Sequence, residues 1–245
     1  MLFQGTKPPS PFMKATDISN AEKCSSAPNL PDTKPTFAMK RSCSMDILLK
    51  EQLKQSYDKR VEERDSMMTS DWKSGEIDMF SSFLEDGSAI LNLGSGPGQH
   101  ALYMQGKGLD LTCIDLSENM VQSCKAKHLN AFQMDFYNLD FEKSTFDGVF
   151  AMNTLLHVPK DSLVSVLENI KRILKPGGIF YMGVYGGMDS EGVWKDDLYE
   201  PKRFFSFFEH EDIKKTVENV FKLIEFKVIP IKGDGPDYQS ILLRK

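Results

Sequence analysis

Short apolar runs alternate with amphipathic segments along most of the chain. The runs with the composition of buried strands cover 89–93, 109–114, 128–134, 146–153 and 179–184. Segments with apolar residues at helical spacing lie between them, at 99–106, 117–127 and 160–174. A helix over 209–220 and two strands over 221–231 and 238–243 complete the pattern. The alternation predicts an α/β protein with a mostly parallel sheet.

The N-terminal part of the chain has a different composition. Residues 1–45 contain half of the 12 prolines, many Ser and Thr residues and no periodic apolar pattern, which predicts a disordered leader. A helix is expected to begin at Met45 or Asp46, and a second amphipathic segment covers 72–84. We therefore expect one domain over 46–245, in which 46–86 form a helical lid ahead of the first strand.

A glycine-rich turn, Gly94-Ser95-Gly96-Pro97-Gly98, directly follows the first strand. Glycines at this spacing let the backbone turn sharply and let a ligand approach without a Cβ in its way. The second strand ends at Asp115, where nucleotide-binding α/β folds hold a pair of ribose hydroxyls. The last glycine of a dinucleotide fingerprint is replaced by Gln99, and no GxxxxGK(S/T) phosphate loop is present. The turn therefore indicates a nucleoside ligand of another kind.

The GxGxG turn with Pro97 inside it resembles motif I of the class I S-adenosylmethionine-dependent methyltransferases. The later pattern FDGV…LLHVP…L…I…LKPGG…F is similar to motifs IV and V of the same family, so the resemblance covers about 90 to 185. It implies a Rossmann-like, doubly wound sheet of seven strands in the order 3-2-1-4-5-7-6, with strand seven antiparallel. It also implies S-adenosyl-L-methionine as the cofactor.

The resemblance further implies which residues bind the cofactor. They are Tyr57, Asn92, Gly94, Ser95, Gly96, Gly98, Asp115, Leu116, Met120, Asp135, Phe136 and Asn153. Tyr57 begins a segment similar to the family's Tyr-Asp-x-x-Ala, and Asp135 takes the role of accepting a hydrogen bond from the adenine amino group. A core aromatic at Tyr57 and a surface acid at Asp135 are the alternatives. Asn92 departs from the family, which usually has an acid there.

Methyl transfer from a sulfonium mainly requires that the acceptor atom be aligned with the methyl group and that water be excluded. A base is needed only where the acceptor must lose a proton. His157 follows the fourth strand and has a suitable unperturbed pKa, so it is the candidate base. The alternative is a histidine that holds its loop by hydrogen bonds.

A long segment without regular periodicity, 185–208, follows the fifth strand. Its position in the chain places it over the carboxyl ends of the strands, where ligands bind in such sheets. Arg203 is a candidate to pair with an anionic substrate, and aromatic side chains are candidates to wall the substrate pocket: Trp194, Phe204 and Phe205. Ordinary packing is the alternative for each of them.

Composition narrows the class of protein. The 245 residues carry a net charge of -5, which argues against a nucleic-acid surface. No apolar run of about 18 residues and no signal-peptide pattern are present. The four cysteines lack metal-binding spacing, so we expect no metal, free thiols and a cytoplasmic location.

The sequence leaves three functional hypotheses. The first is an active methyltransferase that acts on a small molecule. The second is a tRNA or protein methyltransferase, and the third is a non-catalytic binding or scaffold protein that uses the leader to bind partners. The acceptor atom and the oligomeric state are open at this point.

Overall fold

The structure is a computed structural model, and it describes residues 37–231 and 235–245. The chain divides into two units, Met1–Ser44 and Met45–Lys245. In the first unit only residues from 37 onward are described, where they form the start of α1 (Phe37–Asp58). Most of the predicted leader, and with it the predicted partner-binding segment, lies outside the described residues.

The second unit contains the sheet and its helices. The further helices are α2 (Val61–Ser66), α3 (Asp71–Ser81), α4 (Gln99–Gln105), α5 (Glu118–Ala126), α6 (Lys160–Ile173) and α7 (His210–Glu218), with a 3-10 turn over Leu155–His157. The strands are β1 (Ala89–Leu93), β2 (Asp110–Asp115), β3 (Asn130–Gln133), β4 (Phe146–Met152), β5 (Leu174–Gly186), β6 (Ser190–Val193), β7 (Phe204–Phe207), β8 (Lys222–Ile229) and β9 (Asp237–Arg244).

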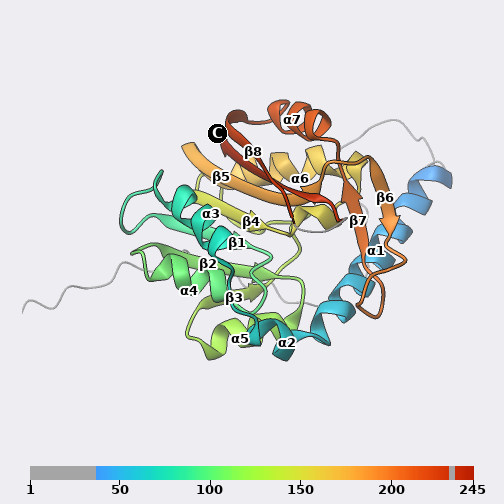
Figure 1. Cartoon of the computed structure of the whole chain (residues 1–245), viewed down its shortest axis with the longest axis horizontal. Helices are drawn as coiled ribbons and strands as arrows, with labels where there is room; N and C mark the ends of the chain where they lie inside the picture. Colours follow the sequence, from blue (N-terminus) through green and yellow to red (C-terminus); the bar gives the residue numbers. More distant parts are fainter. Residues whose placement is uncertain (1–36, 232–234) are drawn as a thin grey trace, which may run out of the picture. The chain divides into compact units, whose positions relative to one another are not determined.

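The seven-stranded sheet has the order β3-β2-β1-β4-β5-β9-β8. Neighbouring strands from β3 to β5 are parallel, whereas β9 runs antiparallel to both β5 and β8 (Figure 1). Because β6 and β7 form a sheet of their own, this is the predicted seven-strand order with its antiparallel strand. The expected fold class is confirmed.

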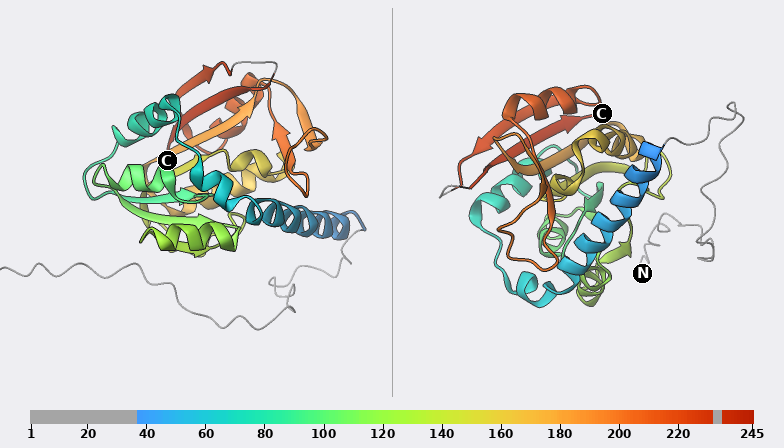
Figure 2. Two further views of the ribbon diagram at one scale, coloured as in Figure 1. Left: turned by 60° about the horizontal axis from the view of Figure 1, so that its bottom comes forward. Right: turned by 90° about the vertical axis from the view of Figure 1, so that its right-hand side faces the viewer.

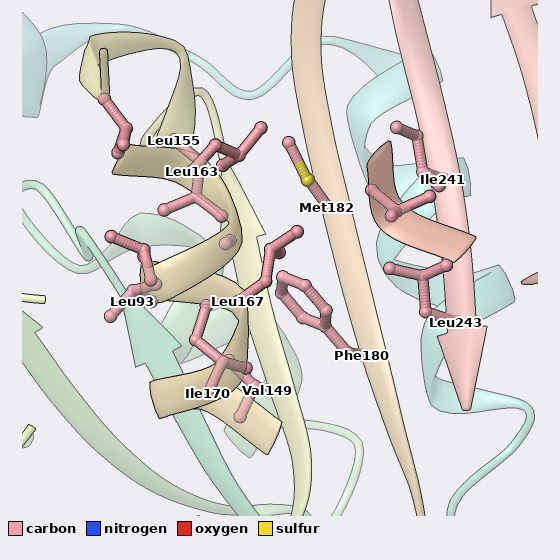
Figure 3. Packing of buried hydrophobic residues seen from close by; sticks show 14 of the residues in the cluster. Leu93, Val149, Leu155, Leu163, Leu167, Ile170, Phe180, Met182, Ile241 and Leu243 are labelled. Carbon is pink, nitrogen blue, oxygen red and sulfur yellow. The ribbon is translucent and has the colours of Figure 1, made fainter. Parts of the chain in front are cut away.

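Helices cover both faces of the sheet (Figures 1 and 2). On one face, side chains of α6 and α7 pack against alternate residues of the central strands, and Figure 3 shows Leu163, Leu167 and Ile170 of α6 beside Val149 and Phe180. On the other face, α3, α4 and α5 pack against the intervening residues. This packing explains why β1 and β4 have no polar alternation, since each of them is buried on both sides.

The largest differences from the sequence prediction occur in three places. The first helix begins at Phe37 rather than Met45 or Asp46. β5 begins at Leu174 rather than at residue 179, because Leu174 pairs with Phe146 and the chain bulges before Ile179 pairs with Gly148. The third place is the segment 185–208, which is expected to lack regular structure but contains two strands.

The segment 185–208 contains the hairpin-like pair β6 and β7. Its strands hold each other in register from Ser190 opposite Phe207 to Val193 opposite Phe204. A long, acidic connection separates the two strands. The local sequence therefore has no apolar and polar alternation that would predict this pairing. The connection contacts the turn between α1 and α2, where Arg60 Nη2 donates to the carbonyl of Leu198 at 2.7 Å.

Candidate active site

The glycine turn lies at the carboxyl end of β1 and requires two glycines for different reasons. Gly94 has φ of +66°, and a Cβ there would lie 2.4 Å from Oγ1 of Thr154. Gly96 has φ of +54°, and a Cβ there would meet nothing within 4 Å. Gly94 thus allows close packing against the end of β4, whereas Gly96 leaves open space beside the turn.

Asp115 connects the glycine turn to the end of β2. Its Oδ2 accepts a hydrogen bond from the Gly96 amide at 2.8 Å, and its Oδ1 accepts one from the Ser117 amide at 2.9 Å. Burial raises the pKa of the Asp115 carboxyl, while the two amides and the charge of Arg64 act in the opposite direction. Each carboxylate oxygen can accept more than one hydrogen bond, so ribose hydroxyls can still donate to Asp115.

Asp58, at the end of α1, contacts the loop that follows Asp115. Asp58 Oδ1 accepts hydrogen bonds from Ser117 Oγ at 2.5 Å and from the Asn119 amide at 3.3 Å, so it supplies an acceptor to the first turn of α5. Ser117 in turn accepts from the Met120 amide, which makes it the N-cap of α5. The carboxylate therefore anchors α1 to the loop that follows Asp115.

A cavity of about 60 Å³ lies between these elements. The predicted cofactor residues that line it are Tyr57, Gly94, Gly96, Asp115, Leu116, Phe136 and Asn153. We call it the donor pocket. Leu116 and Phe136 also line a smaller adjoining cavity together with Asp135. The structure thus gathers most of the predicted cofactor residues at one edge of the sheet.

Four predicted cofactor residues are absent from the walls of these two cavities. Ser95 instead lines the larger cavity described below. Gly98 is the N-cap of α4 at φ of +92°, where a Cβ would lie 2.6 Å from Leu129. Met120 is fully buried in α5. Asn92 is buried on the face of β1 that packs against α3 and α4, and its Nδ2 has no hydrogen-bond partner among the described residues.

Asp135 follows the end of β3 and already has two partners. Its Oδ2 lies 2.7 Å from Nζ of Lys50 in α1, and its Oδ1 accepts from the Tyr137 amide at 3.0 Å. Both side chains of the ion pair are about a third exposed, so the pair contributes little to stability. A ligand amino group at Asp135 would share or replace the contact with Lys50.

A larger cavity, of about 810 Å³, adjoins the donor pocket. We call it the acceptor cavity. The two cavities share residues of the glycine turn and of the segment after β4: Gly94, Gly96, Asn153 and His157. Trp194 and Phe205 of the β6–β7 segment line the acceptor cavity, as predicted for a substrate wall, with ring centroids 5.4 Å apart in an edge-to-face contact. Phe204 instead lines the small cavity near Asp135.

Arg203, the predicted partner of an anionic substrate, is already engaged within the protein. Its Nε and Nη2 donate to the two oxygens of Asp197 at 2.9 and 2.7 Å, and its Nη1 donates to Oη of Tyr57 at 3.1 Å. The Asp197 side chain is only 5% exposed. This bidentate pair neutralises the guanidinium charge.

His157 has a hydrogen-bond partner on each ring nitrogen. Nδ1 lies 2.7 Å from the carbonyl of Phe204, and Nε2 lies 2.8 Å from Oη of Tyr57. A carbonyl can only accept, so Nδ1 carries the proton and Nε2 accepts from the tyrosine. Burial lowers the pKa of His157 to about 3, and the charges of Arg203 and Arg64 act in the same direction. The imidazole is therefore neutral at physiological pH.

Two buried polar atoms along the donor pocket have no hydrogen-bond partner among the described residues. They are Oδ1 of Asn153 and Nε of Arg64. Asn153 also has φ of +58°, a conformation that asparagine tolerates better than most residues. Unsatisfied buried polar atoms are costly, so an unpaired acceptor and an unpaired donor on residues that line one pocket indicate a polar ligand.

Sequence reasoning missed several residues of these cavities. Thr154, Arg64 and Lys73 were not singled out, although all three line them. Thr154 had a usable signal, since it lies two residues after the end of β4 and next to the predicted Asn153. Arg64 and Lys73 had none, because charged residues on amphipathic helices are ordinarily solvated.

No cluster of three or more His, Cys, Asp or Glu side chains suited to a metal ion occurs in 37–231 or 235–245. In the same residues, no helix has the length and apolar character needed to span a membrane.

Comparisons with known proteins agree with the fold. Residues 91–182 match the family described as Methyltransferase domain. The sterol 24-C-methyltransferase erg6 of Schizosaccharomyces pombe is 32% identical over 144 residues, which cover 55% of this chain and 34% of that protein. The Saccharomyces cerevisiae ERG6 enzyme is 33% identical over 107 residues, covering 40% and 27%. The chain spans about a third of the length of the curated relatives it matches.

Solved structures with the same fold have lower sequence identity. The 1,6-didemethyltoxoflavin-N1-methyltransferase of Burkholderia thailandensis, solved with S-adenosylhomocysteine, superposes with a TM-score of 0.66 at 17% identity, covering 88% of this chain and 93% of that chain. A methyltransferase of Haloferax volcanii in complex with the activator Trm112 superposes at 0.61 and 20% identity, covering 80% and 96%.

The chain therefore carries a methyltransferase domain and has the fold of the class I S-adenosylmethionine-dependent methyltransferases. The predicted resemblance is confirmed. S-adenosylmethionine is the methyl donor of this class, and the site fits it in three respects. Asp115 lines the pocket with acceptor capacity, Gly96 leaves open space, and Asn153 and Arg64, which also line it, each have a buried polar atom without a partner among the described residues.

Proposed function

We propose that this protein transfers a methyl group from S-adenosylmethionine to a small molecule. The observation that carries the proposal is the direct junction of the donor pocket with the acceptor cavity at Gly94, Gly96 and Asn153. The acceptor cavity has about 810 Å³, which lies within the roughly 300–1,000 Å³ of small-molecule sites. Its aromatic wall suits an acceptor with an apolar body.

The donor pocket supports a specific role for each cofactor residue. Asp115 would accept hydrogen bonds from the ribose hydroxyls, and Leu116 and Phe136 would pack against the adenine. Asp135 would accept a hydrogen bond from the adenine amino group, in exchange with Lys50. Oδ1 of Asn153 would accept from the donor's ammonium. When bound, S-adenosylmethionine supplies a methyl group on a positively charged sulfur.

The contribution of the protein itself is then alignment and exclusion of water, which can account for several kcal/mol of the barrier. Tyr57, His157 and Arg203 form a hydrogen-bonded row along the junction of the two cavities. Two features of His157 favour a positioning role over a role as general base. Its Nε2 lone pair is occupied by Tyr57, and its pKa of about 3 makes it a weak base at neutral pH.

Calorimetry with S-adenosylmethionine and S-adenosylhomocysteine tests the first half of the proposal. Micromolar binding is expected, and no binding at millimolar ligand would reject both methyltransferase hypotheses in favour of a scaffold. Transfer of a labelled methyl group then tests the acceptor class. Label is expected in a metabolite extract that includes sterols. Incorporation into the RNA or protein fraction alone would replace the small-molecule proposal with the second hypothesis.

A further inference from the structure

One part of the acceptor cavity is lined by basic side chains. Arg64 of α2, Lys73 of α3 and His100 of α4 all line it, and they come from three consecutive helices before β2. Lys73 and His100 line only this cavity, whereas Arg64 lines the donor pocket as well. Their common position suggests a ligand group of opposite charge.

Neither cation at this position has a carboxylate partner. Among the described residues, Arg64 and Lys73 form no ion pair, whereas twelve other pairs are present. Arg64 donates through Nη1 to Oη of Tyr199 at 3.3 Å, and its buried Nε donates to nothing. The Lys73 ammonium lies 5.5 Å from the Trp72 ring centroid. A buried guanidinium with a free donor is a costly arrangement unless an anion completes it.

The two cations also act on each other and on the neighbouring imidazole. Burial and then the charge of Arg64 lower the pKa of the Lys73 ammonium. Burial, together with the charges of Lys73 and Arg64, lowers the pKa of His100 to about 4. An anion bound between these groups would remove this repulsion.

The acidic residues of the same cavity do not compensate these charges. Asp197 forms its ion pair with Arg203, on the β6–β7 side. Asp196 is exposed in the connection between β6 and β7. The cavity thus combines an aromatic wall with a basic position at which Lys73 has no ion-pair partner among the described residues, while the Asp115 carboxylate of the donor pocket acts only on Arg64.

We propose that the methyl acceptor carries a carboxylate or phosphate group, which Arg64 and Lys73 bind. The inference rests on the proposed function, because it names the class of acceptor for that site. The carboxylate of the methyl donor has the same chemistry and is the alternative source of the anion. Arg64 lines both cavities, whereas Lys73 lines only the acceptor cavity, so Lys73 reports on the acceptor.

Inorganic phosphate is the probe, titrated by calorimetry at constant ionic strength into the full chain saturated with S-adenosylhomocysteine. We expect millimolar binding to the wild type. Lys73→Gln should weaken it about tenfold, the loss of one charge-assisted contact. Lys73→Arg should retain it. Lys125→Gln, at an exposed lysine of α5 outside both cavities, is the matched control and should leave it unchanged.

Several results would overturn the inference. One is no phosphate binding to the saturated wild type, and another is equal binding to wild type and Lys73→Gln. A third is that Lys73→Gln weakens the binding of S-adenosylhomocysteine but not that of methylthioadenosine, which lacks the carboxylate. The basic position would then bind the carboxylate of the methyl donor and not a group of the acceptor. Failure of S-adenosylhomocysteine to bind would instead reject the proposed function. Phosphate titrated into the unliganded chain would still test whether Arg64 and Lys73 bind an anion.

Discussion

The hydroxyl of Tyr57 lies 2.8 Å from Nε2 of His157, although one residue ends the first helix and the other follows the fourth strand. The pair joins the lid to the end of the sheet. Arg203 extends it, since its Nη1 donates to the same hydroxyl. Three segments that are distant in the sequence therefore meet in one hydrogen-bonded row at the junction of the two cavities.

This row predicts that Tyr57 and His157 act as a unit in turnover. His157→Ala and Tyr57→Phe should each lower kcat about tenfold, because each removes one hydrogen bond of the same pair. Affinity for S-adenosylhomocysteine should change little with His157→Ala. Steady-state kinetics with the acceptor found by labelling measures this. A loss of about 100-fold or more in His157→Ala alone would identify His157 as a general base instead.

Asp115 predicts a strong effect on cofactor binding. Asp115→Ala should weaken the binding of S-adenosylmethionine by about 10- to 100-fold, since hydrogen bonds to a charged group contribute roughly 1.5–3 kcal/mol. Calorimetry measures the change. Asp110→Ala is the matched control, because Asp110 begins the same strand at its opposite, exposed end. Unchanged affinity in Asp115→Ala would remove the ribose assignment.

The two glycines of the turn predict opposite consequences for the same substitution. Gly94→Ala should mainly destabilise the fold, because its Cβ would overlap Thr154. Gly96→Ala should fold with a smaller loss, about 1–2 kcal/mol for the left-handed backbone, and lose cofactor affinity because its Cβ enters open space at the pocket. Thermal unfolding and calorimetry on both variants compare them. Equal loss of stability with retained affinity in Gly96→Ala would contradict the assignment.

The buried histidines predict acid sensitivity. The pKa values of His157 and His100 are lowered to about 3 and about 4, below the ordinary value of 6.5. Between these values the unfolded chain binds protons that the folded chain does not, so stability is full above about pH 6.5 and falls as pH decreases. Thermal unfolding across this range measures it. His157→Gln should flatten the dependence, and an unchanged slope would show that His157 titrates normally in the fold.

The sequence determined the strand, glycine turn, helix, strand and acid that end at Asp115, because burial on both faces and positive φ leave local signatures. The same holds for the seven-strand order, given the family resemblance. Tertiary structure alone decided that Arg203 is neutralised by Asp197, that β6 pairs with β7, and that Arg64 and Lys73 line the acceptor cavity. These outcomes depend on which charges meet when distant segments pack, and residue spacing along one chain does not encode that.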